Sequence, residues 1–118
     1  MFNFEKLDVW HKAIEFADLV YVVTGTFPSD ERFGLTNQMR RAAVSVSSNI
    51  AEGTSRSSKT DFARFVEIAT GSVFEVVSQA TVSQRREFLS EADYRKIYAA
   101  AEEQSRMLSG LRKALIGE

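Results

Sequence analysis

The 118-residue sequence has no cysteine, one proline and one histidine. Without cysteine the chain cannot form a disulfide, a thiol nucleophile or a Cys-ligated metal site. With only Pro28 and six glycines, long stretches are free of residues that break helices. These absences exclude a disulfide-rich domain and favour long helical segments.

Long apolar runs and a large net charge are also missing. No apolar stretch approaches the roughly 18 to 20 residues of a membrane span. Residues 1–6 lack the basic start and apolar run of a signal peptide, so the sequence predicts a cytoplasmic protein with no membrane partner. Fifteen Lys and Arg against sixteen Asp and Glu give a formal charge of -1. Any binding of nucleic acid must therefore rest on a local basic patch.

What the sequence does contain is helical periodicity in successive segments. Apolar residues recur at spacings of three and four, which predicts helices at about 7–26, 35–52, 58–86 and 90–115. Alternating strand patterns are missing. A chain of 118 residues is long enough for one hydrophobic core and too short for two of ordinary size, so we expect a single domain over residues 1–118. Its short connections predict an all-α, antiparallel up-down-up-down four-helix bundle.

The first segment carries apolar residues on two neighbouring helix faces, more than a surface helix needs. One face consists of Val9, Ala13, Phe16, Val20, Val23 and Phe27. The other consists of Leu7, Trp10, Ile14, Ala17, Tyr21 and Thr24. We expect one face to join the core and the other to meet another subunit, which predicts a homo-oligomer.

The connections carry capping and turn residues. Ser58 and Ser90 are predicted N-caps of the third and fourth helices. Gly53 is predicted to end the second helix in a left-handed conformation. Phe27 and Phe33 flank the first connection and are expected to pin it to the core. The second helix is expected to face inward with Leu35, Met39, Ala42, Val46 and Ile50. The main stripe of the third helix consists of Phe62, Phe65, Ala69, Val73, Val76 and Ala80.

No arrangement typical of an active site is found. His11 is the single histidine, and nothing at helical spacing supplies a nucleophile or further metal ligands, so a solvated position beside Trp10 is expected. The Glu-x-x-His pattern of di-iron bundles and a Gly-rich phosphate loop are both missing. We expect no enzyme activity, no metal and no cofactor.

The second helix has an unusual charge pattern. From Thr36 through Ile50 its only charges are the adjacent Arg40 and Arg41. A basic patch repeated around an oligomer could neutralise enough phosphates to bind nucleic acid. The candidate nucleic-acid contacts, including those just beyond the following turn, are Arg40, Arg41, Arg56, Lys59 and Arg64.

A second interpretation needs no ligand. Arg40 and Arg41 could be solvated or pair with carboxylates such as Glu67 or Glu75 on the neighbouring helix. Downstream, Asn49 and Glu52 are one turn apart and could hydrogen-bond to each other, although polar residues near a helix end commonly serve termination or an interface.

Several segments together resemble a known family. They are 7–13, 27–28, 33–35, 38–53 and 69–72, with 38–53 (QMRRAAVSVSSNIAEG) the most specific. The chain resembles the four-helix-bundle proteins encoded in 23S rRNA intervening sequences. That family is similar in fold to the accessory variability protein of diversity-generating retroelements, a pentameric barrel of bundles that associates with nucleic acid and reverse transcriptase.

The resemblance implies a homopentameric ring, RNA or DNA as a partner, and a reverse transcriptase or other protein as a further partner. Its hallmark residues here include Trp10, the arginine pair and Asn49 to Gly53. Ser47 stands where the family commonly has proline, which implies a straighter second helix. Val77 stands where glutamate is common, which implies an altered interface or a changed partner for the arginines.

The sequence therefore predicts a non-enzymatic, oligomeric accessory protein that associates with nucleic acid through a basic patch. The alternative is a structural or protein-protein interaction scaffold that binds no nucleic acid, in which the arginines form salt bridges between subunits.

Overall fold

The structure is a computed structural model, and it describes residues 1–117. Within that range the protein is all-α, with four α-helices, two short 3-10 helices and no strand. The elements in chain order are η1 (Asn3–Lys6), α1 (Asp8–Thr24), η2 (Ser29–Glu31), α2 (Leu35–Gly53), α3 (Lys59–Arg85) and α4 (Glu91–Ile116). None of these helices is both long enough and apolar enough to cross a bilayer.

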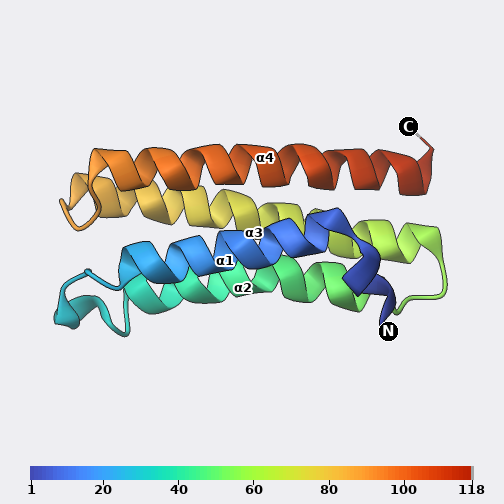
Figure 1. The fold of residues 1–118 in the computed structure, drawn as a ribbon, viewed down its shortest axis with the longest axis horizontal. Coiled ribbons are helices and arrows are strands. Elements are labelled where there is room, and N and C mark those ends of the chain that lie inside the picture. Colours follow the sequence, from blue (N-terminus) through green and yellow to red (C-terminus); the bar gives the residue numbers. More distant parts are fainter. Residues whose placement is uncertain (118) are drawn as a thin grey trace.

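The four α-helices lie side by side along the long axis of a body that measures 43 × 24 × 19 Å (Figure 1). Followed by colour, the chain runs along α1, back along α2, out along α3 and back along α4. Helices α1 and α3 each pack against both α2 and α4. The α2–α3 loop therefore lies at the same end as both termini, and the other connections lie at the opposite end (Figure 1).

The predicted N-caps of α3 and α4 are confirmed. Ser58 Oγ accepts a hydrogen bond from the Asp61 backbone N–H at 3.0 Å, and Ser90 Oγ accepts one from the Asp93 N–H at 3.1 Å. Each bond satisfies an N–H group that has no partner inside the helix. The two aspartates also place negative charge in the positively polarised first turn of their helices.

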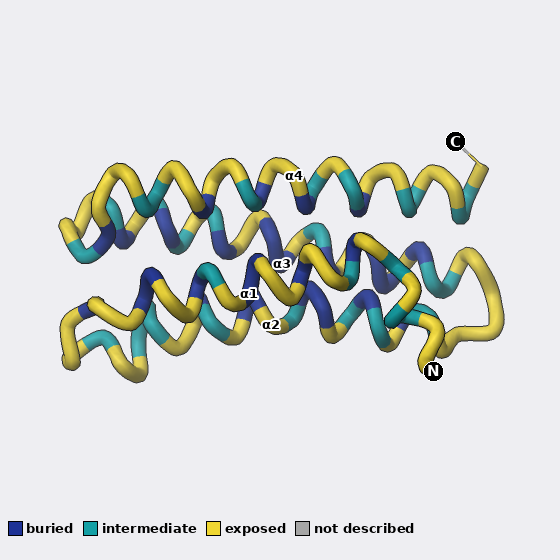
Figure 2. Tube along the Cα trace, viewed as in Figure 1, coloured by how far each residue is buried: buried dark blue, intermediate teal, exposed yellow. Residues whose placement is uncertain are grey.

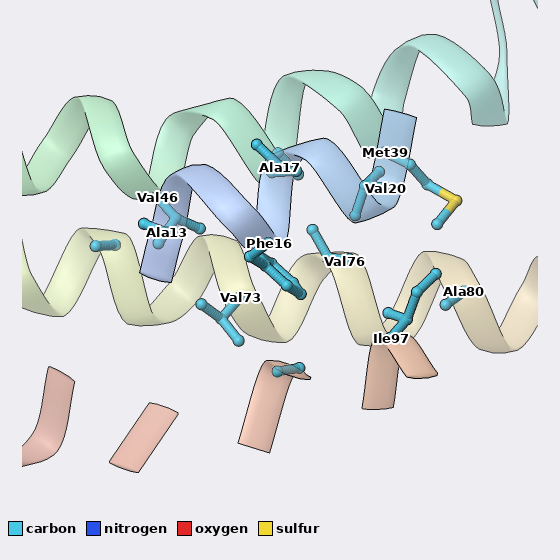
Figure 3. Packing of buried hydrophobic residues seen from close by; sticks show 14 of the residues in the cluster. Ala13, Phe16, Ala17, Val20, Met39, Val46, Val73, Val76, Ala80 and Ile97 are labelled. Atoms are coloured by element: carbon cyan, nitrogen blue, oxygen red, sulfur yellow. The ribbon is translucent and has the colours of Figure 1, made fainter. Parts of the chain in front are cut away.

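One side of each helix faces the core, as the dark side of each tube in Figure 2 shows. In α1 this is the face of Phe16 and Val20, which are 2% and 0% exposed. Figure 3 shows Phe16 reaching toward α3 near Val73 and Val76. The other α1 face lies beside α2 with part of its surface open, since Ile14 is 37% and Tyr21 47% exposed. Only one of the two stripes therefore joins the core in full.

The predicted role of Gly53 is wrong. Gly53 has no left-handed backbone, because it is the last residue of α2 and Thr54 follows with φ −66°. A Cβ added to Gly53 would lie 2.7 Å from Phe62 Cδ1 and 3.0 Å from Phe65 Cβ. Glycine is required here because α3 approaches the backbone of α2 too closely for a side chain.

The predicted role of Phe33 is also wrong, although Phe27 behaves as expected. Phe27 is buried against Phe88, with ring centroids 6.1 Å apart. Phe33 is 85% exposed, and its ring lies 5.9 Å from the guanidinium of Arg32. The short helix η2 and the turn before α2 carry Phe33 out of the core. Of the two phenylalanines, only Phe27 therefore packs the α1–α2 connection against the core.

Candidate nucleic-acid interface

Arg40 and Arg41 lie in a groove of about 580 Å³ on the outer side of α1 and α2. The residues that line it are Tyr21, Asn37, Arg40, Arg41, Val44, Ser45 and Ser48. None of these side chains is a carboxylate, and two are cationic. The groove is therefore a local positive site on a chain whose formal charge is -1.

Arg40 is held in place by α1. Its Nε donates to Thr24 Oγ1 at 2.9 Å and its Nη2 donates to the Tyr21 carbonyl at 3.2 Å. Its guanidinium carbon lies 4.5 Å from the centroid of the Tyr21 ring. Thr24 is the last residue of α1, so Arg40 places a cation at the negatively polarised end of that helix. Arg40 therefore fastens α2 to the end of α1.

Arg41 is different. It is exposed, and within residues 1–117 it takes part in no ion pair. The two carboxylates named as alternative partners are engaged elsewhere: Glu67 accepts from Arg112 Nε at 2.7 Å, and Glu75 accepts from Gln79 at 3.4 Å. Pairing with Glu67 or Glu75 inside the chain is therefore wrong for both arginines.

This difference predicts unequal effects on stability for two adjacent arginines. Arg40→Ala should lower the free energy of unfolding by about 1–2 kcal/mol, because it removes two charge-assisted hydrogen bonds and a cation–π contact. Arg41→Ala should change it by less than about 0.5 kcal/mol, as expected for an exposed site. Urea denaturation of the two variants measures both. Equal effects would contradict the assigned roles.

The other predicted basic contacts, Arg56, Lys59 and Arg64, lie at the end of the bundle formed by the α2–α3 loop. Arg56 pairs with Glu52 at 2.9 Å and with Asp61 at 3.8 Å. Arg64 pairs with Asp61 at 3.1 Å. Both guanidiniums also lie over the Phe65 ring, at 4.5 and 4.7 Å from its centroid. The charges of Arg56 and Arg64 are therefore largely compensated within the chain. Lys59 is exposed and takes part in no ion pair within residues 1–117.

The five basic residues consequently do not form one patch. Arg41 and the C-terminal end of α2 at Gly53 are about 18 Å apart along the helix, at 1.5 Å per residue. The loop that carries Arg56 comes after that end, where Figure 2 shows mostly exposed residues. The structure brings Arg40 and Arg41 together and leaves Arg56, Lys59 and Arg64 elsewhere.

Asn49 and Glu52 do not hydrogen-bond to each other, and Asn49 has the interface role that was the alternative for polar residues near this helix end. Asn49 Nδ2 donates to the Ser45 carbonyl at 2.8 Å and to Ser45 Oγ at 2.9 Å, whereas Glu52 pairs with Arg56. Ser45 Oγ is also 2.9 Å from Ser72 Oγ on α3. Asn49 is therefore part of a polar connection between α2 and α3.

The remaining aromatic candidates lie near the N-terminus. Trp10 is half-buried and packs against Phe4 of η1, with centroids 4.9 Å apart. His11 is exposed beside Trp10, as expected, and its Nε2 donates to the Glu5 carbonyl at 2.7 Å. In residues 1–117 no three His, Asp or Glu side chains gather as a metal site would need.

Sequence reasoning missed a second groove, of about 510 Å³, between α3 and α4. Its apolar lining includes Phe74, Val77 and Tyr98, and Phe74 is 65% exposed. The signal was available, because Phe74 lies off the predicted inward stripe of its helix. Val77 lines this groove between α3 and α4, whereas Arg40 and Arg41 lie on α2 in the groove beside α1. Within the chain, position 77 is therefore no partner for the arginines. Helix α2 is continuous through Ser47.

Helices α1 and α4 are also joined by a surface ion pair. Lys12 Nζ lies 3.3 Å from Glu103 and 3.8 Å from Glu15. The hydrogen bond and charge attraction from Glu103, with a smaller attraction from Glu15, raise the pKa of Lys12 above its ordinary value. The Lys12–Glu103 pair thus links α1 to α4 at the surface.

Comparison with known proteins agrees with the resemblance seen in the sequence. A crystal structure of a protein with unknown function from the S23 ribosomal protein family of Bacteroides thetaiotaomicron VPI-5482 has a TM-score of 0.82 and 24% identity, over 89% of this chain and 95% of that one. That similarity concerns the fold. No curated protein matches the chain. The family model described as 23S rRNA-intervening sequence protein matches residues 5–110, and the chain belongs to that family.

Proposed function

We propose that the protein is a non-enzymatic accessory protein that associates with RNA or DNA in the cytoplasm, and that its up-down-up-down bundle is the subunit of a homo-oligomeric ring. The observation that carries the proposal is Arg41, an exposed cation in a groove whose lining contains no carboxylate. Arg40 contributes to the same positive site, although its hydrogen bonds to α1 fix its position.

Assembly matters because one subunit offers few phosphate contacts. One or two contacts give little affinity, whereas several linked sites act at a high effective concentration. A ring repeats the α1–α2 groove once per subunit. The number of phosphate contacts therefore grows with the number of subunits, although the chain as a whole is not basic. The net charge of -1 is then compatible with nucleic-acid association.

Apolar surface on two different sides of the bundle supports assembly into a ring. Ile14 and Val22 are exposed on α1, outside the lining of the α1–α2 groove, and Phe74 and Tyr98 are exposed on α3 and α4. A contact that joins two unlike patches is head-to-tail, and such contacts close into rings when the rotation allows. A homopentamer, with a reverse transcriptase or other protein as a further partner, is the form that the family resemblance implies.

The α3–α4 groove favours a second candidate function, a scaffold without nucleic acid. Glu102 lies in that apolar groove, so it could receive Arg41 of a neighbouring subunit across a head-to-tail contact. The arginine charge would then serve assembly. Under this alternative, Arg41→Ala breaks the oligomer.

Fluorescence anisotropy with a labelled structured RNA separates the two functions. We expect wild-type protein to bind and Arg41→Ala to bind at least about 10-fold more weakly, with light scattering showing the same mass for both. Arg95→Ala is the matched control, since it removes an exposed arginine from α4, the helix diagonal to α2 in the described bundle, at a position outside the lining of the α3–α4 groove. No binding by the wild type, or an Arg41→Ala protein that becomes monomeric, would favour the scaffold.

A further inference from the structure

Tyr21 gives the α1–α2 groove an aromatic surface beside its positive charge. The side chain is 47% exposed, and Arg40 lies against its ring at 4.5 Å. Because Arg40 is anchored to Thr24 and to the Tyr21 backbone, the ring and the guanidinium form a fixed pair. A planar guanidinium and an aromatic ring are the two groups on which proteins commonly stack nucleobases.

The other residues of the groove fit the polar parts of a nucleotide. Arg41 is an exposed cation, Asn37 an exposed amide, and Ser48 an exposed hydroxyl. The groove volume of about 580 Å³ also lies within the range of roughly 300–1,000 Å³ typical of small-ligand sites. An aromatic ring, an uncompensated cation and an amide therefore converge on one nucleotide-sized depression.

We propose that this groove binds an unpaired nucleotide of a single-stranded nucleic acid, with the base stacked on Tyr21 and the adjacent phosphate bound by Arg41. The inference rests on the proposed function and narrows its ligand to single strands. In a duplex the base faces are covered by neighbouring pairs, so Tyr21 would have nothing to stack on. Stacking also supplies affinity that one free cation per subunit lacks.

The preference is tested with labelled single-stranded RNA, single-stranded DNA and an RNA duplex of equal length, titrated against the same protein preparations. We expect the wild type to bind both single strands at least about 10-fold more tightly than the duplex. Tyr21→Leu should lose most of this preference, because a leucine fills space but cannot stack. Tyr21→Phe should keep it. Equal affinity for single strands and duplex, or no effect of Tyr21→Leu, would overturn the inference.

The design separates this inference from the proposed function. If the wild type binds single strands and duplex equally and Arg41→Ala weakens both, nucleic-acid association stands and base stacking fails. If nothing binds, both fail. Tyr21→Leu removes the ring contact of Arg40 but retains the backbone carbonyl and the Thr24 hydroxyl that accept its hydrogen bonds, so those two bonds between α1 and α2 are preserved. Circular dichroism and light scattering check the fold and mass, and a Tyr21→Leu protein of changed mass would overturn the inference in favour of a subunit contact.

A second measurement needs no variant. Single-stranded RNA with 5-iodouridine is irradiated in complex with wild-type protein, and the cross-linked peptide is identified by mass spectrometry. Trypsin releases residues 13–32 as one peptide, in which Tyr21 is the single tyrosine. A cross-link at Tyr21 supports the stacked base. Cross-links confined to the α2–α3 loop, where Arg56 lies, would contradict it.

Discussion

Phe16→Ala is expected to lower the free energy of unfolding by about 3–5 kcal/mol, the largest effect of any substitution considered for this protein. Phe16 is 2% exposed and reaches from α1 toward α3 near Val73 and Val76 (Figure 3). Truncation removes the ring from the apolar interior and leaves a cavity that close-packed helices fill only in part. Urea or guanidinium denaturation followed by circular dichroism measures the loss.

Phe33→Ala is the matched control for Phe16→Ala. The same atoms are removed, but Phe33 is 85% exposed, so the free energy of unfolding should change by less than about 0.5 kcal/mol. Similar losses of stability from the two variants would show that Phe33, in the connection between α1 and α2, is packed against the core and not exposed. A small loss at Phe16 would contradict the assignment of its stripe to the core.

Gly53→Ala is expected to destabilise the protein by about 1–3 kcal/mol, although alanine is the better helix former. The new Cβ would lie 2.7 Å from the ring of Phe62 and 3.0 Å from Phe65 Cβ, so α3 must move away from α2. Moving Phe65 would also disturb its contacts with the guanidiniums of Arg56 and Arg64. Thermal or chemical denaturation measures the change.

Gly71→Ala should have the opposite sign. Gly71 lies inside α3 at an exposed position, and a Cβ added there meets nothing within 4 Å. The substitution should therefore stabilise the protein by about 0.5–1 kcal/mol through helix propensity alone. If both glycine variants shift stability in the same direction, close packing at Gly53 is not the reason for its glycine.

Helical periodicity was enough to predict the inward faces of α2 and α3, where Met39, Val46, Val73 and Val76 are fully buried or nearly so. In α1 the same spacing appeared on two faces, and spacing alone does not say which face meets which neighbour. Gly53 was misread because a glycine that permits close packing and one that ends a helix look alike in sequence. Deciding between them requires the position of α3.

The candidate site was predicted only in part. Arg40 and Arg41 are adjacent in sequence, yet successive helical residues point about 100° apart, so one reaches the end of α1 and the other faces solvent. Sequence gave no sign that Thr24 and Tyr21 hold Arg40. Arg56 and Arg64 were grouped with the pair by charge alone, although Glu52 and Asp61 compensate them.

Missed features of the site share one cause. The α1–α2 groove combines Tyr21 with Asn37 and Arg41 from a different helix, and the α3–α4 groove combines Phe74 with Tyr98 in the same way. A pattern within one helix identifies an outward residue but not what lies beside it. Both grooves depend on how neighbouring helices align along the bundle.

The salt dependence of RNA binding tests the central claim most directly. Affinity of the wild-type protein for a single-stranded RNA is measured by anisotropy from low to high salt and compared with that of Arg41→Ala. If Arg41 contacts phosphate, the slope of log affinity against log salt should become less steep by about 0.7 for each Arg41 that engages a single strand. An unchanged slope with intact oligomers would contradict a role for Arg41 in binding phosphate.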